Sequence, residues 1–185
     1  TGSNTALTNL VSNSGVVASD VSGVGSARRA LAAAGYGGPA VGKAIFGYGL
    51  VSGNVTLTNL VSNVGVVASD VSGVGTARRV LSAAGYGEDK AIFGYGFVSS
   101  ASSLTNLVSN TGVVASDVSG VGTARYGLAS TAYGGDKAIF AYGWTGSAYV
   151  SMSNLVNSSG VVAADVTGVG TARSSPSGAG YSTSA

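Results

Sequence analysis

The stretch D-K-A-I-F-G-Y-G at residues 89–96 decides the fold, because this segment is repeated along the chain. It recurs as G-K-A-I-F-G-Y-G at 42–49 and as D-K-A-I-F-A-Y-G at 136–143. Its β-branched and aromatic residues favour a short buried strand. The neighbouring segments of the chain occur four times and this one only three times, so one repeat lacks it.

A second segment marks the repeat along the whole chain. T-N-L-V-S-N begins at Thr8, Thr58 and Thr105, and a degenerate copy begins at Ser153, in steps of 50, 47 and 48 residues. Residues 58–78 match the corresponding residues of the next copy at 20 of 21 positions. The longer first step comes from an insertion of three residues before Lys43, which a loop tolerates and a strand does not.

Each unit divides at Gly, Ser and Asn into four pieces of strand length: L-T-N-L-V-S, G-V-V-A-S-D-V-S, A-R-R-V-L-S-A-A and K-A-I-F-G-Y-G. The alanines at 30–34 favour a helix, but about seven residues between glycines are too few for a stable one, so we expect a strand there. Four strands in about 47 residues match one blade of a β-propeller. We therefore expect an all-β fold.

The order of these pieces resembles the kelch repeat. From Val74, V-G-T-A-R leads into an Ala-rich strand, a Gly/Asp/Lys turn, the strand A-I-F-G-Y-G, a variable loop and a strand near Asp. G-Y-G stands where kelch units have adjacent glycines, and the late Trp is absent. The resemblance implies four kelch-like four-stranded units in a β-propeller, with an open repeat array or fibre as the alternative. The single domain 1–185 would divide into units 24–73, 74–120, 121–168 and a split unit made of 169–185 plus 1–23.

The wording T-N-L-V-S-N-T-G-V-V-A-S-D with D-K-A-I-F-G-Y-G is similar to repeats of phage virion and tail-appendage proteins. That resemblance implies a structural or adhesive protein located on a virion or outside the cell. Its partners would be further copies of itself, other virion proteins or surface glycans.

The ends of the chain carry two halves of one unit that lacks its K-A-I-F-G-Y-G strand. Three arrangements are open. The ends can pair into an imperfect fourth blade that closes a ring, or the chain can be a slice of a longer array. Alternatively, another chain completes the open half-unit, because an unpaired strand edge is a template for a further strand. Head-to-tail completion that does not close gives a filament.

Composition narrows the function classes. The chain has 185 residues, no His and no Cys, so thiol chemistry, His-based acid–base catalysis and Ser-His-Asp triads are excluded. The net charge of +2 is too small for a nucleic-acid footprint. No apolar run reaches the ~18 residues that cross a bilayer, so we expect no membrane insertion. We expect no enzyme, no cofactor and no metal, although a carboxylate pair of the glycosidase type remains an alternative.

One Asp and one Arg recur eight residues apart in every unit. We interpret them as repeated ion pairs or turn caps that fix the register of the unit; one carboxylate per unit argues against a calcium site. The lysine before each I-F-G-Y segment, with its preceding Asp in two copies, predicts a solvated turn pair. The paired residues are Asp20/Arg28, Asp70/Arg78, Asp117/Arg125 and Asp165/Arg173.

The aromatic residues fall into two groups. The Phe and Tyr of each F-G-Y-G or F-A-Y-G segment are expected to form the core between units (Phe46, Phe93, Phe140, Tyr48, Tyr95 and Tyr142). The segments that follow diverge while their flanks barely change, as is typical of loops that bind ligands, although neutral drift explains them equally well. The candidate binding residues in these loops are Leu50, Phe97, Trp144 and Tyr149, because exposed aromatic rings stack on sugars and protein surfaces.

The sequence therefore predicts a non-enzymatic structural or adhesive repeat protein that resembles a phage tail-fibre or virion appendage and contacts a host or particle surface. A self-assembling extracellular filament subunit and a secreted carbohydrate-binding propeller are the alternatives.

Overall fold

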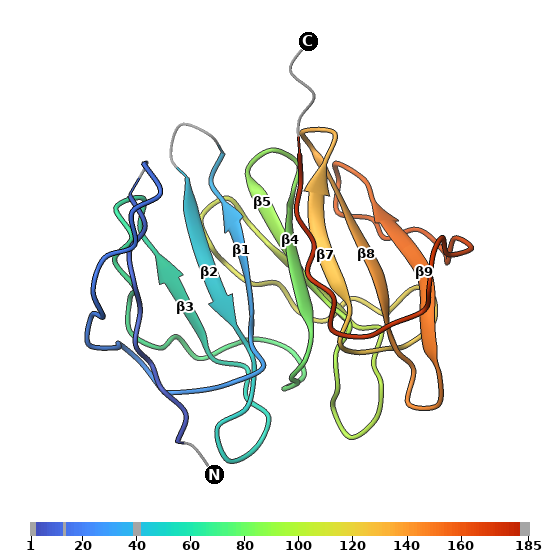
Figure 1. The fold of residues 1–185 in the computed structure, drawn as a ribbon, viewed down its shortest axis with the longest axis horizontal. Helices are drawn as coiled ribbons and strands as arrows, with labels where there is room; N and C mark the ends of the chain where they lie inside the picture. Colours follow the sequence, from blue (N-terminus) through green and yellow to red (C-terminus); the bar gives the residue numbers. More distant parts are fainter. Residues whose placement is uncertain (1–2, 13, 39–41, 182–185) are drawn as a thin grey trace.

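The computed structural model describes residues 3–12, 14–38 and 42–181. Its nine strands form three antiparallel sheets of three strands each, in sequential order, and no helix is present in the described residues. Figure 1 shows the three sheets. The strands are β1 (Ala32–Tyr36), β2 (Lys43–Gly47), β3 (Thr58–Val61), β4 (Ser82–Tyr86), β5 (Lys90–Gly94), β6 (Thr105–Val108), β7 (Ala129–Tyr133), β8 (Lys137–Trp144) and β9 (Tyr149–Val156).

Each sheet is one copy of the sequence repeat. The K-A-I-F-G segment forms the middle strand, the Ala-rich segment pairs on one side of it and T-N-L-V pairs on the other. The register is the same in every sheet, with the phenylalanine of the middle strand opposite the asparagine of T-N-L-V or S-N-L-V. The all-β prediction is confirmed. The strand predicted for the alanines at 30–34 is confirmed from Ala32 on, but Ala30 lies in a bend with a φ of 54° before it. The insertion predicted for a loop lies between β1 and β2, and its residues 39–41 lie outside the described residues.

The fourth predicted strand, V-V-A-S-D-V, is not a regular strand. It folds back on β3 through two isolated bridges, Val61 to Val67 and Thr58 to Val71. The amide of Ala68 donates to the carbonyl of Leu60, and that of Val71 to the carbonyl of Thr58. The returning segment therefore advances by three residues where β3 advances by two. Such a bulge interrupts the ladder and turns a side chain in a new direction. Here it turns the carboxylate of Asp70 onto an arginine that precedes the sheet.

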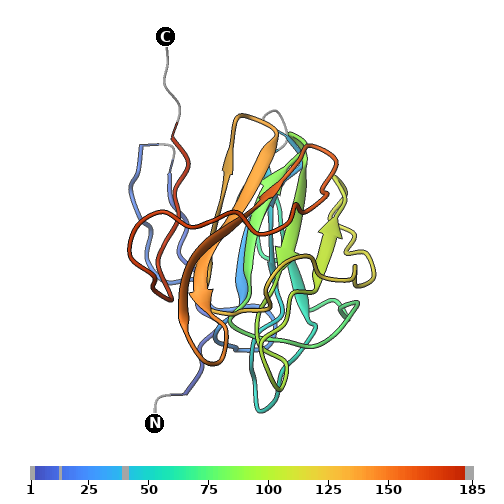
Figure 2. The same ribbon diagram turned by 90° about the vertical axis from the view of Figure 1, so that its right-hand side faces the viewer.

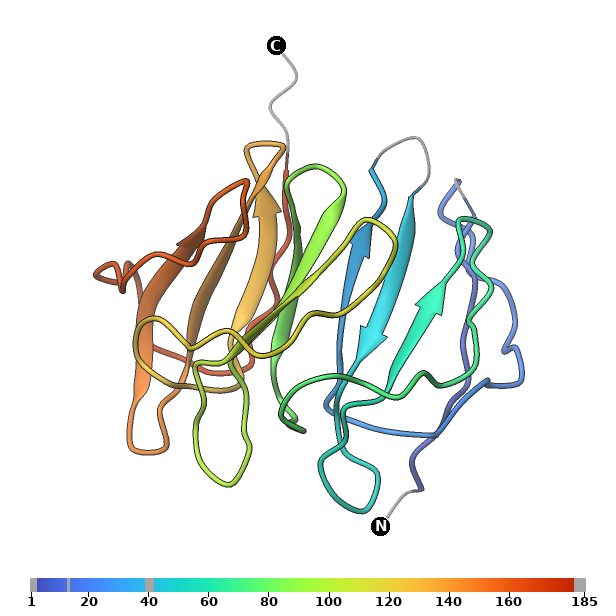
Figure 3. The same cartoon turned by 180° about the vertical axis from the view of Figure 1, so that it is seen from behind.

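The three sheets pack side by side through their first strands. β4 contacts both β1 and β7 (Figure 1, and from behind in Figure 3). The corresponding ends of these three strands line one opening, to which Tyr36, Tyr86 and Ala132 contribute. The side view in Figure 2 places the N-terminal hairpin and the C-terminal segment on the same side of the molecule.

The core between sheets is built from one aromatic contact used twice. Phe93 of β5 lies against Gly47 of β2, and a Cβ on that glycine would stand 2.6 Å from the ring. Gly94 meets Phe140 in the same way, at 2.7 Å. The rings of Tyr48 and Phe93 meet edge to face with centroids 5.2 Å apart. The glycine of F-G-Y-G is therefore required by the close approach of the next sheet.

The predicted core residues are buried only where a further sheet covers them. Tyr48, Tyr95, Phe93 and Phe140 are fully buried. Phe46, on the first sheet, and Tyr142, on the last, are half-buried. The first sheet has no preceding middle strand against Phe46 in the described chain, and the last has no following sheet against Tyr142.

Candidate functional site

The divergent loops lie along one edge of the molecule. They leave the ends of β2, β5 and β8 and project at the bottom of Figure 1 in cyan, yellow-green and orange. The first residue of each loop pairs with the segment that enters the sheet, through the bridges Leu50 to Arg29, Phe97 to Arg79 and Trp144 to Tyr126. The loops are thus anchored at equivalent positions of the three sheets.

Phe97 is an anchor of this edge. The guanidinium of Arg79 lies 4.5 Å from the centre of its ring, and the ring of Tyr126 meets it edge to face at 5.1 Å. Arg79 also donates to Asn54 of the preceding loop at 2.8 Å, and Asn54 donates to the carbonyl of Val98 at 2.9 Å. Phe97 is partly buried by these contacts and stabilises the loop edge, so it offers less free ring surface to a ligand than Tyr149 does.

Trp144 and Tyr149 come together in the last loop. Their ring centroids are 4.6 Å apart at an angle of 58°, and the residues face each other across the β8–β9 hairpin. Tyr149 is 57% exposed. It borders an open groove whose other walls include Met152 and Ala172. Of the four predicted binding residues, the structure brings only these two into contact, because Leu50 and Phe97 belong to separate loops.

Behind the loop edge, each sheet encloses one arginine. Arg78 donates from Nε to the carbonyl of Tyr95 at 2.9 Å and from Nη2 to the Oδ1 atom of Asn106 at 2.6 Å. Its Nη1 atom lies 3.7 Å from the carboxylate of Asp117. Asn106 in turn donates to that carboxylate at 2.9 Å, and Thr76 donates to its second oxygen at 2.7 Å. Every charged or polar member of this buried cluster therefore has a partner.

The predicted pairing of Asp and Arg eight residues apart is wrong. Each arginine lies before the first strand of a sheet and pairs with the aspartate that follows the third strand of the same sheet. The bulge after T-N-L-V brings that aspartate back toward the arginine. Asp20, expected to pair with Arg28, accepts a hydrogen bond from Asn9 at 2.8 Å instead. The observed ion pairs are Arg28–Asp70, Arg78–Asp117 and Arg125–Asp165.

The same arginines also join one sheet to the next. Arg78 lies 4.3 Å from the ring centre of Tyr48 in the preceding sheet, and Arg125 lies 4.3 Å from that of Tyr95. The hydroxyl of Tyr95 donates to the carbonyl of Val121 at 3.2 Å. Burial raises the pKa of Tyr95 to about 12, so the phenol stays neutral beside the cation. Both tyrosines have a left-handed backbone, with φ of 62°, which directs them toward the next sheet.

Two residue types in this cluster were missed by sequence reasoning. The asparagine of T-N-L-V and the hydroxyl residue of G-T-A-R or G-S-A-R bind each carboxylate together with the arginine. Their signal was present, because both recur in every unit alongside the Asp and Arg. The asparagines are Asn9, Asn59, Asn106 and Asn154, and the hydroxyl residues are Ser26, Thr76, Thr123 and Thr171.

Acid is expected to weaken this cluster. Partial burial alone would raise the pKa of Asp117, but hydrogen bonds from Thr76 and Asn106 and the charge of Arg78 outweigh it and hold the pKa below the ordinary 3.8. A carboxyl with a lowered pKa stabilises the fold above its unfolded pKa, and that contribution is lost as the pH falls through the folded pKa. We expect Asp117→Asn to lower the urea midpoint at pH 7, and to lower it less once the pH falls below the ordinary carboxyl pKa of 3.8. An equal loss at both pH values would contradict the linkage.

The remaining predicted polar pair is confirmed. Lys90 and Lys137 form ion pairs with Asp89 and Asp136 at 2.6 and 2.7 Å, and both lysines are well exposed. These are turn pairs at the edge opposite the divergent loops, and exposed pairs of this kind contribute little to stability.

The described residues contain no group of three or more His, Cys, Asp or Glu that could hold a metal ion. Within the same part of the chain, no helix is long and apolar enough to cross a membrane. In comparisons with known proteins, no family model and no curated protein matched this chain.

Proposed function

We propose that this chain is a non-enzymatic structural repeat protein whose divergent loop edge contacts a surface, as in a phage tail-fibre or virion appendage. The observation that carries the proposal is the contrast between the interior and the edge. The Arg–Asn–Asp cluster and the Phe–Gly contact recur nearly unchanged from sheet to sheet. The loops differ in every unit, and one of them carries the stacked pair Trp144 and Tyr149.

The finer architecture that we propose is a kelch-like propeller of about four units. In support, the first strands β1, β4 and β7 lie side by side and their corresponding ends line one opening, as expected for the innermost strands of neighbouring blades. Residues 173–181 lie beside β7 as β7 lies beside β4. The same backbone hydrogen bond repeats at each step: Val80 donates to Ala30, Gly127 to Val80 and Ser175 to Gly127. Residues 173–181 would form the innermost strand of the fourth, split unit.

The contact with a surface depends on Tyr149 in this proposal. We expect Tyr149→Ala to weaken binding to bacterial envelope glycans by about tenfold, because an exposed ring supplies a stacking surface that alanine lacks. The measurement is binding to an array of envelope glycans, with thermal unfolding followed in parallel. Tyr133→Ala is the matched control, since Tyr133 is an exposed tyrosine at the opposite edge. Equal binding of the two variants, or binding of the unchanged chain to no glycan surface, would contradict the proposal.

A filament subunit is the second candidate, and two incomplete Arg–Asn–Asp clusters in the described chain favour it. Arg173 lies 3.9 Å from the ring centre of Tyr142 but contacts no Asn or Asp in the described chain. At the other end, Asn9 and Asp20 bind each other without an arginine. Head-to-tail copies would complete one Arg–Asn–Asp cluster at each joint. A mass that grows with protein concentration in light scattering, and that Arg173→Glu reduces to the monomer, would support this candidate over an isolated surface-binding chain.

A further inference from the structure

The N-terminal hairpin folds although no middle strand pairs with its T-N-L-V segment in the described residues. Val21 donates to the carbonyl of Thr8 and Ala18 to that of Leu10, both at 2.8 Å. The complete first unit has the same bonds, from Val71 to Thr58 and from Ala68 to Leu60, at 2.8 Å. The hairpin formed by residues 8–12 and 14–21 therefore has the backbone arrangement that pairs with a middle strand in the complete units.

The edge of this hairpin that would pair with a middle strand is open. In the complete units, Asn59 and Asn106 are buried opposite the phenylalanine of the middle strand. Asn9, their equivalent, is exposed. Val11 is 64% exposed, whereas the equivalent Val108 is 0% exposed. Alternate residues of a strand direct their amides to the same side. Because Thr8 and Leu10 bond to the returning segment, the backbone of Asn9 and Val11 faces the empty side.

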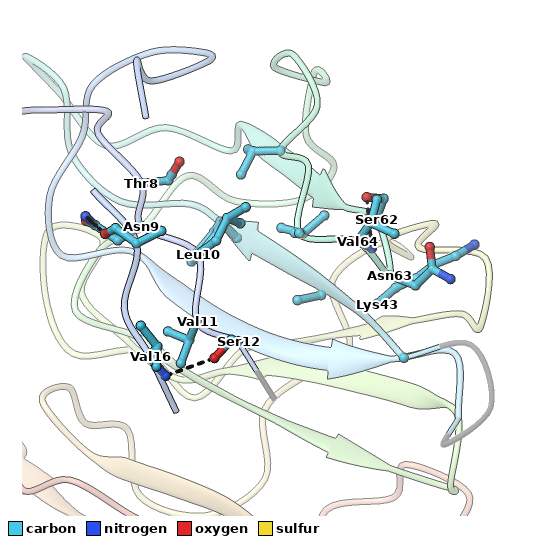
Figure 4. Close-up of a pocket in the computed structure, with 17 residues that line it drawn as sticks. Thr8, Asn9, Leu10, Val11, Ser12, Val16, Lys43, Ser62, Asn63 and Val64 are labelled. Atoms are coloured by element: carbon cyan, nitrogen blue, oxygen red, sulfur yellow. Dashed lines mark hydrogen bonds between the residues drawn. The ribbon is translucent and has the colours of Figure 1, made fainter. Parts of the chain in front are cut away.

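A groove of about 800 Å³ occupies the position of the missing strand (Figure 4). One wall is the open edge from Thr8 to Val11, and the other is the face of the first sheet with Ala44, Phe46 and Val61. The residues equivalent to Phe46 in the next two sheets are Phe93 and Phe140, and each lies against the glycine of the preceding middle strand. A strand in this groove would therefore place a glycine on Phe46.

A second cavity of about 210 Å³ continues from the groove and has the lining expected for a tyrosine. Val24 and Arg28 contribute to it, together with Phe46. In the next units the equivalent residues hold the preceding tyrosine: Val74 accepts a hydrogen bond from Tyr48, and Arg78 lies over its ring. The side chain of Arg28 is only 3% exposed, as the other cluster arginines are buried.

We propose that this groove binds an extended peptide strand of the K-A-I-F-G-Y-G type. The strand pairs antiparallel with Thr8–Val11, sets its glycine on Phe46 and places its tyrosine over Arg28. The carbonyl of Leu7 accepts from the tyrosine amide, as Leu57 accepts from Tyr48 at 2.9 Å. A folded second copy is not the donor, because each of its own K-A-I-F-G segments is bonded on both sides. Addition of a strand to an open edge, with pockets for alternate side chains, gives both affinity and specificity.

The test uses a fluorescent peptide that reproduces residues 88–98, added to the whole chain and followed by anisotropy. We expect saturable binding with one peptide per chain. A Gly94→Ala version of the peptide should bind about tenfold or more weakly, because its Cβ would meet the ring of Phe46. A Tyr95→Leu version should bind about fivefold more weakly, since it cannot stack with Arg28. A scrambled peptide of the same composition should not bind.

A compensating pair of substitutions, one in the chain and one in the peptide, distinguishes docking in the groove from nonspecific binding. Phe46→Ala removes the ring that excludes the larger peptide, so this variant should bind the Gly94→Ala peptide more tightly than the unchanged chain does. Phe93→Ala is the control, because Phe93 already lies against Gly47 and does not line the groove. Absence of saturable binding, equal binding of all four peptides, or no gain with Phe46→Ala would overturn the proposal. The outcome is independent of Tyr149 and of the proposed surface contact.

Discussion

Arg78→Met lowers the free energy of unfolding by about 3–5 kcal/mol, which is the cost of removing one partner from a buried ionic cluster. The substitution keeps much of the apolar volume of the side chain but leaves Asn106 and Asp117 without their cation. It also removes the cation over the ring of Tyr48, so the contact between the first and second sheets weakens with the cluster. Urea unfolding followed by circular dichroism measures the change.

Arg173→Met is the matched control for this prediction. Arg173 has the same place in the repeat, but it is exposed and has no Asn or Asp partner among the residues described. We expect a loss of less than about 1 kcal/mol, from the stack on Tyr142 alone. If both substitutions cost the same, the closed cluster is not what stabilises the sheets.

Phe140→Ala is expected to cost about 3–5 kcal/mol, as is usual when a fully buried aromatic ring is removed. The ring fills the space beside Gly94 and meets Tyr95 edge to face, so its loss opens a cavity between the second and third sheets. The backbone around Gly94 cannot move in to fill this cavity, because β5 and β8 are each paired with a strand on both sides. The urea midpoint of the variant measures the cost.

Phe46→Ala tests whether this cost comes from stacking between sheets. Phe46 has the same strand position and the same cross-strand asparagine, but it faces the open groove and is half-buried. We expect a loss of about 1–2 kcal/mol, roughly half that of the buried ring. Comparable losses for both phenylalanines would mean that the rings act within their own sheets.

Much of the fold follows from local pattern. The K-A-I-F-G segment has strand propensity and strand length, and its recurrence at a nearly constant step indicates equivalent sheets. The Ala-rich strand is harder, since alanine favours helices, and only the short distance between glycines indicates a strand. Residue propensities do not predict the positive φ of Tyr48 and Tyr95. That conformation depends on an arginine and a backbone carbonyl of the next unit, which hold each tyrosine ring in place.

The arginine cluster shows where sequence spacing misleads. Arg28 and Asp20 are near in sequence, so a local ion pair was the simpler interpretation. The partner is Asp70 because a bulge, which depends on hydrogen bonds to β3, reverses the direction of that carboxylate. The loop edge shows the same limit. Sequence divergence marks Phe97 and Tyr149 alike, but only contacts in space show that Arg79 and Tyr126 partly cover Phe97 while Tyr149 is exposed.

Amide hydrogen exchange of the chain alone, resolved by residue, tests most directly whether three units are complete and one lacks its middle strand. The amides of Asn59 and Val61 face β2 and should exchange at least about a hundredfold more slowly than those of an unstructured chain. The equivalent amides of Asn9 and Val11 face the empty groove and should exchange near the unstructured rate. Protection of Asn9 and Val11 equal to that of Asn59 and Val61 would show that a strand already fills the groove, and would contradict the open unit.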